Sequence, residues 1–432
     1  MRIFATFSPV LRLNLAFLFC TGLCFWAGLA GLLPTLPLFI ETLGATGAQI
    51  GVVMASFAFG LLAARPFLSR LADEQGRKRV LMIGIGAIAT APFLYWLAVL
   101  LPPLTWQLRW EDSVLEVNGL IVLMMIFRAF HGLSIAAFVV AYSALVIDIS
   151  PPANRGEIIG YMSLVNPIGM ASGPALGSFL LDWGNFSIAF LTMGFIGILG
   201  LILGSQVQET YQRPVLTKHQ TPPLFWQLLW APRVRTPALI LLLVGLAFGN
   251  LATFVPLFVR EAGIALNVGL IYTASAIASF AIRLPVGRAS DRYGRGRFIT
   301  VSLLFYTMAM LAFWLASTPV MFLLAGLIQG CAAGTLIPMI AALMGDRAEP
   351  NERGKVFGLA MVGFDIGIAI AGPLFGRFAD WVSYRDSFAL AALMTFVGFL
   401  IFITTSSKDL NHSLRFALSH GRDVYAVDAP TQ

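Results

Sequence analysis

Twelve apolar runs, each long enough to cross a membrane, limit this chain to one class of fold. A transmembrane helix needs about 20 predominantly apolar residues. The runs lie at 12–40, 48–69, 80–101, 119–147, 157–181, 186–205, 236–260, 267–287, 298–316, 320–345, 355–380 and 384–406. Because lipid offers no partner to backbone N–H and C=O groups, and because the runs lack the alternation of a β-barrel strand, each one is expected to be helical. The sequence predicts an all-α membrane protein with twelve transmembrane helices.

Composition and the placement of charge agree with this prediction. Hydrophobic residues make up 58% of the chain and charged residues 11%, whereas soluble domains carry about 25% charged residues. The net charge of +7 does not indicate a nucleic-acid partner, because most Lys and Arg residues fall on one side if the N-terminus is inside. We therefore expect a multi-pass protein in the lipid bilayer of the plasma (inner) membrane, with both termini cytoplasmic.

A short charged turn is repeated once in each half of the chain. Its shared residues are Arg65, Arg70, Asp73, Gly76, Arg77 and Arg79 in the first copy, and Arg283, Arg288, Asp291, Gly294, Arg295 and Arg297 in the second. Gly permits a tight turn, Asp favours a helix N-terminus, and Arg can reach carboxylates or lipid phosphates. A basic loop that only sets topology is the alternative. The repetition in a membrane chain instead points to two related halves and to a secondary transporter.

A second repeat lies deeper in each half. Gly132, Asp148, Arg155, Gly156, Gly160, Asp182 and Trp183 return as Gly330, Asp346, Arg353, Gly354, Gly358, Asp380 and Trp381. The altered spacing between the two repeats places an insertion, expected to be an external loop, at Thr105–Asn118. We predict two pseudo-symmetric six-helix bundles at 1–205 and 236–406, a cytoplasmic linker at 206–235, and a polar, disordered cytoplasmic tail at 407–432. This organisation favours a substrate path between the halves.

The repeated turn resembles the signature loop of the major facilitator superfamily, Gly-x-x-x-Asp-Arg-x-Gly-Arg followed by Arg or Lys. The second copy matches from Gly287 to Arg295, whereas the first departs at Ser69 and Glu74. In that family the loop holds the cytoplasmic gate. The resemblance therefore implies a gate role for Asp73, Gly76, Arg77, Arg79, Asp291, Gly294 and Arg295.

The fifth span contains a spaced series of glycines around one proline: Gly160, Gly169, Gly173, Pro174 and Gly177. Small residues let membrane helices approach closely, and an internal Pro kinks a helix. The spacing resembles the antiporter signature of the same family, with Ser178 in place of the last Gly. The resemblance implies drug:proton antiport, hence export, while a generic close-packed interface is the structural alternative.

Three ionisable residues lie deep inside spans. Arg128 and His131 are one turn apart in the fourth span, and because a lone Arg is costly in lipid it should face the protein interior or water. Their segment resembles the family's Arg-x-x-Gln-Gly motif, which is implicated in proton coupling, with His131 in place of Gln. Asp365 lies near the middle of the eleventh span, with no Lys or Arg within one turn. We expect Asp365 to carry the coupled proton and Arg128 and His131 to assist; a structural Asp365, paired with Arg128 or bonded to backbone, is the alternative.

The remaining polar residues inside spans are weaker candidates. Asn14, Asn166 and Asn250 could line the substrate path or could bond between helices. The three cysteines lie inside spans without metal-ligand spacing, and the chain has no nucleotide-binding loop and no Ser/His/Asp set. We therefore expect no metal, no cofactor and no enzymatic activity.

These observations lead to one prediction of function and two alternatives. The chain resembles the major facilitator superfamily, and within it the twelve-helix drug:proton antiporters. The resemblance implies a monomeric, proton-coupled secondary transporter that exports small organic molecules, drugs or metabolites, by alternating access. Proton-coupled uptake of a small metabolite and lipid or glycolipid flipping by the same fold remain the alternatives.

Overall fold

A computed structural model describes residues 7–110, 113–209, 229–349, 353–418, 420–421 and 423–427. The side chains of a few residues inside these ranges, Asp73 and Asp291 among them, lie outside the description. Twelve helical spans in the described part are long and apolar enough to cross a membrane. Each overlaps one of the predicted runs, so the prediction of an all-α membrane protein with twelve spans is confirmed.

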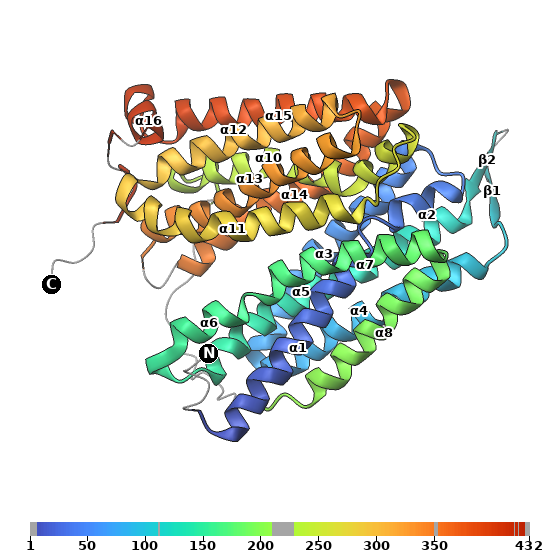
Figure 1. Cartoon of the computed structure of the whole chain (residues 1–432), viewed down its shortest axis with the longest axis horizontal. Coiled ribbons are helices and arrows are strands. Elements are labelled where there is room, and N and C mark those ends of the chain that lie inside the picture. The colour runs from blue at the N-terminus through green and yellow to red at the C-terminus, as the bar shows by residue number, and fades with distance from the viewer. Residues whose placement is uncertain are drawn as a thin grey trace. The chain divides into compact units, whose positions relative to one another are not determined.

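The chain divides into two compact units (Figure 1). Unit 1 is the described part of Met1–Thr217 together with Asn267–Thr273. Its helices are α1 (Pro9–Gly31), α2 (Leu36–Thr42), α3 (Gly47–Gln75), α4 (Arg77–Leu100), α5 (Gly119–Ile149), α6 (Arg155–Met162), α7 (Val165–Trp183) and α8 (Phe186–Ser205). Helices α1 and α2 form one span, and α6 and α7 form another.

Unit 2 is the described part of Lys218–Leu266 and Ala274–Gln432. Its helices are α10 (Pro232–Glu261), α11 (Gly269–Tyr293), α12 (Arg295–Leu315), α13 (Pro319–Asp346), α14 (Arg353–Trp381), α15 (Tyr384–Thr405) and α16 (Leu410–Ala417). The first turn of α11 is the part that packs with unit 1. The linker residues 210–228 lie outside the described residues.

Each unit has its own hydrophobic core. Phe25, Ile88 and Phe138 are fully or almost fully buried in unit 1, as are Leu336 and Phe402 in unit 2. Helix α1 packs on α7 and α8 in the first unit, and α10 packs on α14 and α15 in the second. The same helix pairs therefore build both cores, as expected from the sequence repeats.

The insertion in the first half forms an antiparallel β-hairpin in its described residues. Strand β1 (Thr105–Trp110) pairs with β2 (Ser113–Asn118), so that Trp106 lies opposite Val117. Aromatic and β-branched residues facing each other across strands stabilise such a pair.

The prediction of a disordered tail is wrong for its described residues. Helix α16 packs on α12 and α15, and Phe416 and Ala417 are buried in the core of unit 2. Asp423 forms an ion pair with Arg347, a buried residue that directly follows the C-terminal end of α13. The apolar face of a short amphipathic helix and one buried ion pair hold this segment, although its overall composition is polar.

Candidate functional site

In unit 1 the first copy of the repeated turn forms an ion pair. Gly76 has φ of +100°, a conformation that glycine adopts readily, and it separates α3 from α4. Arg77 then places its Nε 2.8 Å from Oδ2 of Asp148, in the last turn of α5. The backbone N–H of Arg77 donates to the carboxylate of Glu209. The turn thus ties the start of α4 to α5 and to the chain that follows α8.

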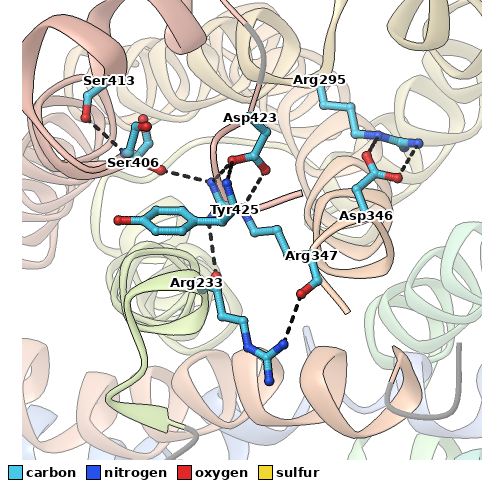
Figure 2. Close-up of polar contacts among 9 residues, drawn as sticks. Arg233, Arg295, Asp346, Arg347, Ser406, Ser413, Asp423 and Tyr425 are labelled. Atoms are coloured by element: carbon cyan, nitrogen blue, oxygen red, sulfur yellow. Dashed lines mark hydrogen bonds and ion pairs between the residues drawn. The ribbon is translucent and has the colours of Figure 1, made fainter. Parts of the chain in front are cut away.

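The second copy forms the equivalent ion pair in unit 2 (Figure 2). Gly294 has φ of +84°, and Arg295 at the start of α12 contacts both carboxylate oxygens of Asp346 at the end of α13. Because Asp148 and Asp346 are themselves repeat mates, the two sequence repeats meet in one ion pair per unit. Both aspartates recur in the sequence, but nothing local in the sequence marks them as the partners of the arginines. Their recurrence was the available signal.

The other gate candidates are placed only in part. Arg79 donates to the side-chain oxygen of Gln75 at 2.6 Å. The side chains of Asp73 and Asp291 lie outside the described residues, so their roles stay predictions. The gate assignment as a whole also stays a prediction, carried by the matched pairs Arg77–Asp148 and Arg295–Asp346.

The glycine series of α7 packs against the backbone of α1. A Cβ atom added at Gly169, Gly173 or Gly177 would overlap main-chain or Cβ atoms of α1. The close approach predicted for small residues is therefore observed at these three positions. A Cβ atom added at Gly160, on α6, would meet no atom within 4 Å among the described residues, so the packing role of Gly160 stays a prediction. Within unit 1, Ser178 Oγ accepts a hydrogen bond of 2.9 Å from the backbone N–H of Gly269.

Arg128 and His131 lie together in a buried cluster on α5. Arg128 is 6% exposed and His131 is fully buried, as expected for charge kept away from lipid. Nδ1 of His131 lies 3.1 Å from Nη1 of Arg128 and 3.0 Å from the hydroxyl of Tyr95. The guanidinium also stacks over the ring of Phe57, 4.5 Å from its centroid.

This geometry fixes the protonation of the histidine. Since a guanidinium can only donate, Nδ1 of His131 acts as the acceptor, and the ring proton belongs on Nε2. Neither Nε2 of His131 nor Nε of Arg128 has a hydrogen-bond partner among the described residues. The cluster is therefore a buried cation with a neutral imidazole, and no described carboxylate pairs with Arg128.

Asp365 lies in α14 where that helix packs most closely on α10. It is 7% exposed. A Cβ atom added at Gly363 would meet the carbonyl of Ala238, and one at Gly367 the carbonyl of Leu242. The two glycines thus hold α14 against α10 on either side of Asp365, which fixes a carboxyl group inside unit 2.

Unit 1 also contains a cavity of about 240 Å³ that one of the predicted path residues lines. Trp26 of α1, Phe138 and Tyr142 of α5, Met162 of α6 and Asn166 of α7 contribute to its wall, which includes no charged side chain. The aromatic rings are ordered: Phe138 stacks on Phe25 with centroids 3.7 Å apart and on Tyr142 at 5.0 Å. The sequence does not distinguish these aromatic residues from the others, because aromatic side chains are common throughout the spans.

The other two asparagines have different surroundings. Asn14 exchanges two hydrogen bonds with the backbone of Gln208, donating at 2.9 Å and accepting at 2.8 Å, which favours a structural role. Asn250 is fully buried in α10, and neither of its side-chain polar atoms has a hydrogen-bond partner among the described residues. Their assignment to a substrate path stays a prediction. The described part of the chain contains no group of three or more His, Cys, Asp and Glu placed to hold a metal ion.

Two units built from the same helix pairs, each with an Arg–Asp pair at its repeated turn, define a membrane transporter of the repeat type. The family model described as Major Facilitator Superfamily matches residues 18–268 and 237–417. This chain therefore belongs to the Major Facilitator Superfamily. The match confirms the resemblance to this family that the sequence motifs indicated. Since members of the family are transporters and not enzymes, it also confirms the expectation of no enzymatic activity.

Relatives and solved structures agree with this assignment. Multidrug resistance protein MdtG of Klebsiella pneumoniae (strain 342) is 26% identical over 377 residues, covering 82% of this chain and 84% of that protein. The multi-drug resistance efflux pump PmrA homolog of Lactococcus lactis subsp. lactis (strain IL1403) is 24% identical over 409 residues, with 87% and 91% covered.

Two solved transporters share the fold at low identity. The nucleoside transporter NupG aligns with a TM-score of 0.72 and 15% identity, over 90% of this chain and 98% of its own. The peptide transporter POT aligns with a TM-score of 0.71 and 12% identity, over 94% and 95%. The chain is thus a multi-pass membrane transporter of the major facilitator fold.

Proposed function

We propose that this protein exports lipophilic organic molecules, drugs or metabolites, in exchange for protons, by alternating access. The observation that carries the proposal is the uncharged, aromatic-lined cavity of unit 1. Ligand pockets are mostly apolar, with a few polar groups that fix orientation, and span about 300–1,000 Å³. At about 240 Å³ the cavity fits one ring system of a drug-sized molecule, held against the cavity wall that includes Trp26 and Phe138, with the Asn166 amide as a polar group.

The direction of transport is supported by two independent observations. The relatives named above carry names of multidrug resistance and efflux. In addition, the spacing of Gly169, Gly173 and Gly177 in α7 resembles the antiporter signature of the family; their contact with α1 is expected of any close-packed interface and carries no direction. We infer export from these two observations together.

Proton coupling is assigned to the buried ionisable groups. Asp365 is the carboxyl buried within α14, and a buried carboxyl can bind and release a proton as its surroundings change. Arg128 supplies a fixed positive charge in unit 1, and His131, neutral in the observed arrangement, orients it. Protonation of Asp365 would then neutralise its carboxylate, as a bound cation would, and return the transporter to its starting conformation.

The remaining features of the proposal concern placement in the cell. The concentration of Lys and Arg near the repeated turns and the tail supports an inner-membrane protein with both termini cytoplasmic. We infer bundle boundaries at 1–205 and 236–406 and a monomeric transporter with no nucleic-acid partner. In this arrangement Arg77–Asp148 and Arg295–Asp346 form the cytoplasmic gate.

The test is proton flux in sealed proteoliposomes during a screen of neutral aromatic drugs. Wild type is compared with Asp365→Asn. The control variant is Glu157→Gln, which removes an exposed carboxylate at the start of the fifth span. We expect substrate and protons to move in opposite directions, with loss of coupling only in Asp365→Asn. Co-directional movement would show uptake instead of export, and a coupled Asp365→Asn protein would refute the assignment of the proton site.

A further inference from the structure

A second cavity, of about 580 Å³, lies at the repeated turn of unit 2 and is rich in cationic side chains. Arg292 closes α11, Arg295 and Arg297 begin α12, and His420 comes from the chain after α16. Phe416 and Leu418 also line it, and no acidic side chain belongs to its described wall. A concave site with three guanidinium groups at a helix N-terminus is suited to a phosphate group.

Two of these arginines are available for a ligand. Arg295 is committed to Asp346. Arg292 and Arg297 are exposed and form no ion pair with a described carboxylate. The guanidinium of Arg292 lies 5.4 Å from the ring centroid of its neighbour Tyr293, a contact that leaves its N–H groups free to donate. Among the described side chains, the cavity wall therefore carries positive charge that no lining carboxylate offsets.

The first unit shows what occupies the equivalent position. There the carboxylate of Glu209 accepts the N–H of Arg77, and a Cβ atom added at Gly76 would lie 2.9 Å from Oε2 of Glu209. An anion thus sits at the start of α4, supplied by the chain itself. In unit 2 the pseudo-equivalent place, at the start of α12, is the basic cavity.

The sequence difference between the copies increases this contrast. Glu74 of the first copy, which pairs with Arg70 at 2.6 Å, is replaced by Arg292 in the second. A local acidic residue is thereby exchanged for a cation. At this position the second copy therefore has one carboxylate fewer and one guanidinium more than the first.

Helix α16 indicates which anion reaches the cavity. Leu410, Leu414 and Leu418 lie four residues apart and are 54%, 37% and 56% exposed, while Phe416 on the opposite side is buried. An exposed leucine stripe on a short helix that follows the last span is typical of a helix lying in the membrane interface. Leu418 belongs both to this stripe and to the cavity wall, so the cavity borders the lipid headgroup layer.

We propose that the basic cavity of unit 2 binds the phosphate of an anionic phospholipid headgroup, held by Arg292 and Arg297. The phosphate lies beside the start of α12, with the acyl chains beside the leucines of α16. Charge selects the headgroup, since a zwitterionic lipid brings no net charge to neutralise the two arginines.

The experiment measures lipid binding to the purified, delipidated full chain by native mass spectrometry. The probes are dioctanoyl phosphatidylglycerol, dioctanoyl phosphatidylcholine and inorganic phosphate. We expect phosphatidylglycerol to bind most tightly. The variant Arg292→Gln/Arg297→Gln should bind it about 30-fold more weakly, since each basic residue near an anionic membrane surface contributes about a fivefold factor.

Two control variants separate charge from structure. Arg235→Gln removes an exposed arginine of unit 2 that does not line the cavity, and binding should be unchanged. Arg292→Lys/Arg297→Lys keeps both charges and should retain most of the affinity. Equal affinity of the glutamine variant and wild type would overturn the site. Inorganic phosphate that competes as well as the lipid would overturn the lipid assignment and show a site for a soluble anion.

Discussion

The described tail of unit 2 is held by one buried cation, and removal of its partner tests that interpretation. Arg347 is fully buried and donates to the Asp423 carboxylate from Nε at 2.6 Å and from Nη2 at 3.0 Å (Figure 2). It also donates to the carbonyls of Arg233 and Ser406, at 3.0 and 2.9 Å. In Asp423→Ala the guanidinium would keep the two carbonyls and lose its only described counter-charge.

The magnitude follows from burial. The side chains of Arg347 and Asp423 are 1% and 9% exposed, so water screens the pair little. Removing one partner of a buried ion pair costs about 3–5 kcal/mol. Two hydrogen bonds to charged groups, at about 1.5–3 kcal/mol each, give a similar value. Because the ion pair joins the tail to the end of α13, we expect this free energy to be lost from the docking of α16.

Hydrogen exchange of the α16 amides in nanodiscs measures the change directly. We expect exchange in Asp423→Ala to be at least about 100-fold faster, since each 1.4 kcal/mol is a factor of ten, up to the rate of an undocked helix. Asp423→Asn should lie between, because it keeps an acceptor but not the charge.

A matched control removes an exposed ion pair. Glu74→Ala breaks the pair with Arg70, whose side chains are 47% and 78% exposed, and such pairs contribute about 0.2–1 kcal/mol. Exchange near Glu74 should change by a few-fold at most. Unaltered exchange of α16 in Asp423→Ala would refute the conclusion that this ion pair holds the tail.

Three further predictions follow from the described contacts. Gly177→Ala should lower the thermal stability of detergent-solubilised protein by about 1–3 kcal/mol through overpacking, whereas Gly160→Ala, at an open helical position, should be neutral or stabilising. A double-mutant cycle on Arg77 and Asp148, read by chemical unfolding, should give a coupling of about 1 kcal/mol or less because the pair is partly exposed. A larger coupling would show that the pair is shielded from water. The pKa of Asp409 lies below its ordinary value because its carboxylate accepts hydrogen bonds from the backbone N–H and from ring Nδ1 of His412. Its contribution to α16 is therefore present at neutral pH and lost as the pH falls through that lowered pKa; the loss, followed by hydrogen exchange, should be absent in Asp409→Ala.

Much of the fold could be predicted because lipid leaves few options. A run of about 20 apolar residues must pair its own backbone groups, so each span was predictable from its own residues. The tail was not, because its docking depends on Arg347, more than 70 residues away from Asp423 in the sequence. The cavity of unit 1 was not predictable either, since Phe138 and Tyr142 have the same local pattern as aromatic residues that face lipid.

The pairing of gate residues lies between these cases. Arg77 and Arg295 recur with their turn, and Asp148 and Asp346 recur with another segment, so the sequence contained both halves of each pair. Nothing local joins them, because the partners come from different helices. Symmetry supplies the missing constraint: residues that recur together in both halves can contact each other in both.

The positions that break this symmetry locate the proposed chemistry. Gln329 of unit 2 stands at the position of His131 in unit 1, since each directly precedes a repeated glycine, Gly330 or Gly132. The side-chain oxygen of Gln329 accepts a hydrogen bond from the hydroxyl of Ser275. Asp365 stands two residues before Gly367, where the first half has Pro167 before Gly169. At these repeat-related positions, a buried imidazole occurs only in unit 1 and a buried carboxyl only in unit 2. Mechanical parts that both halves need are duplicated, whereas a coupled proton needs one carrier, and a second buried carboxyl would add a desolvation cost without adding coupling.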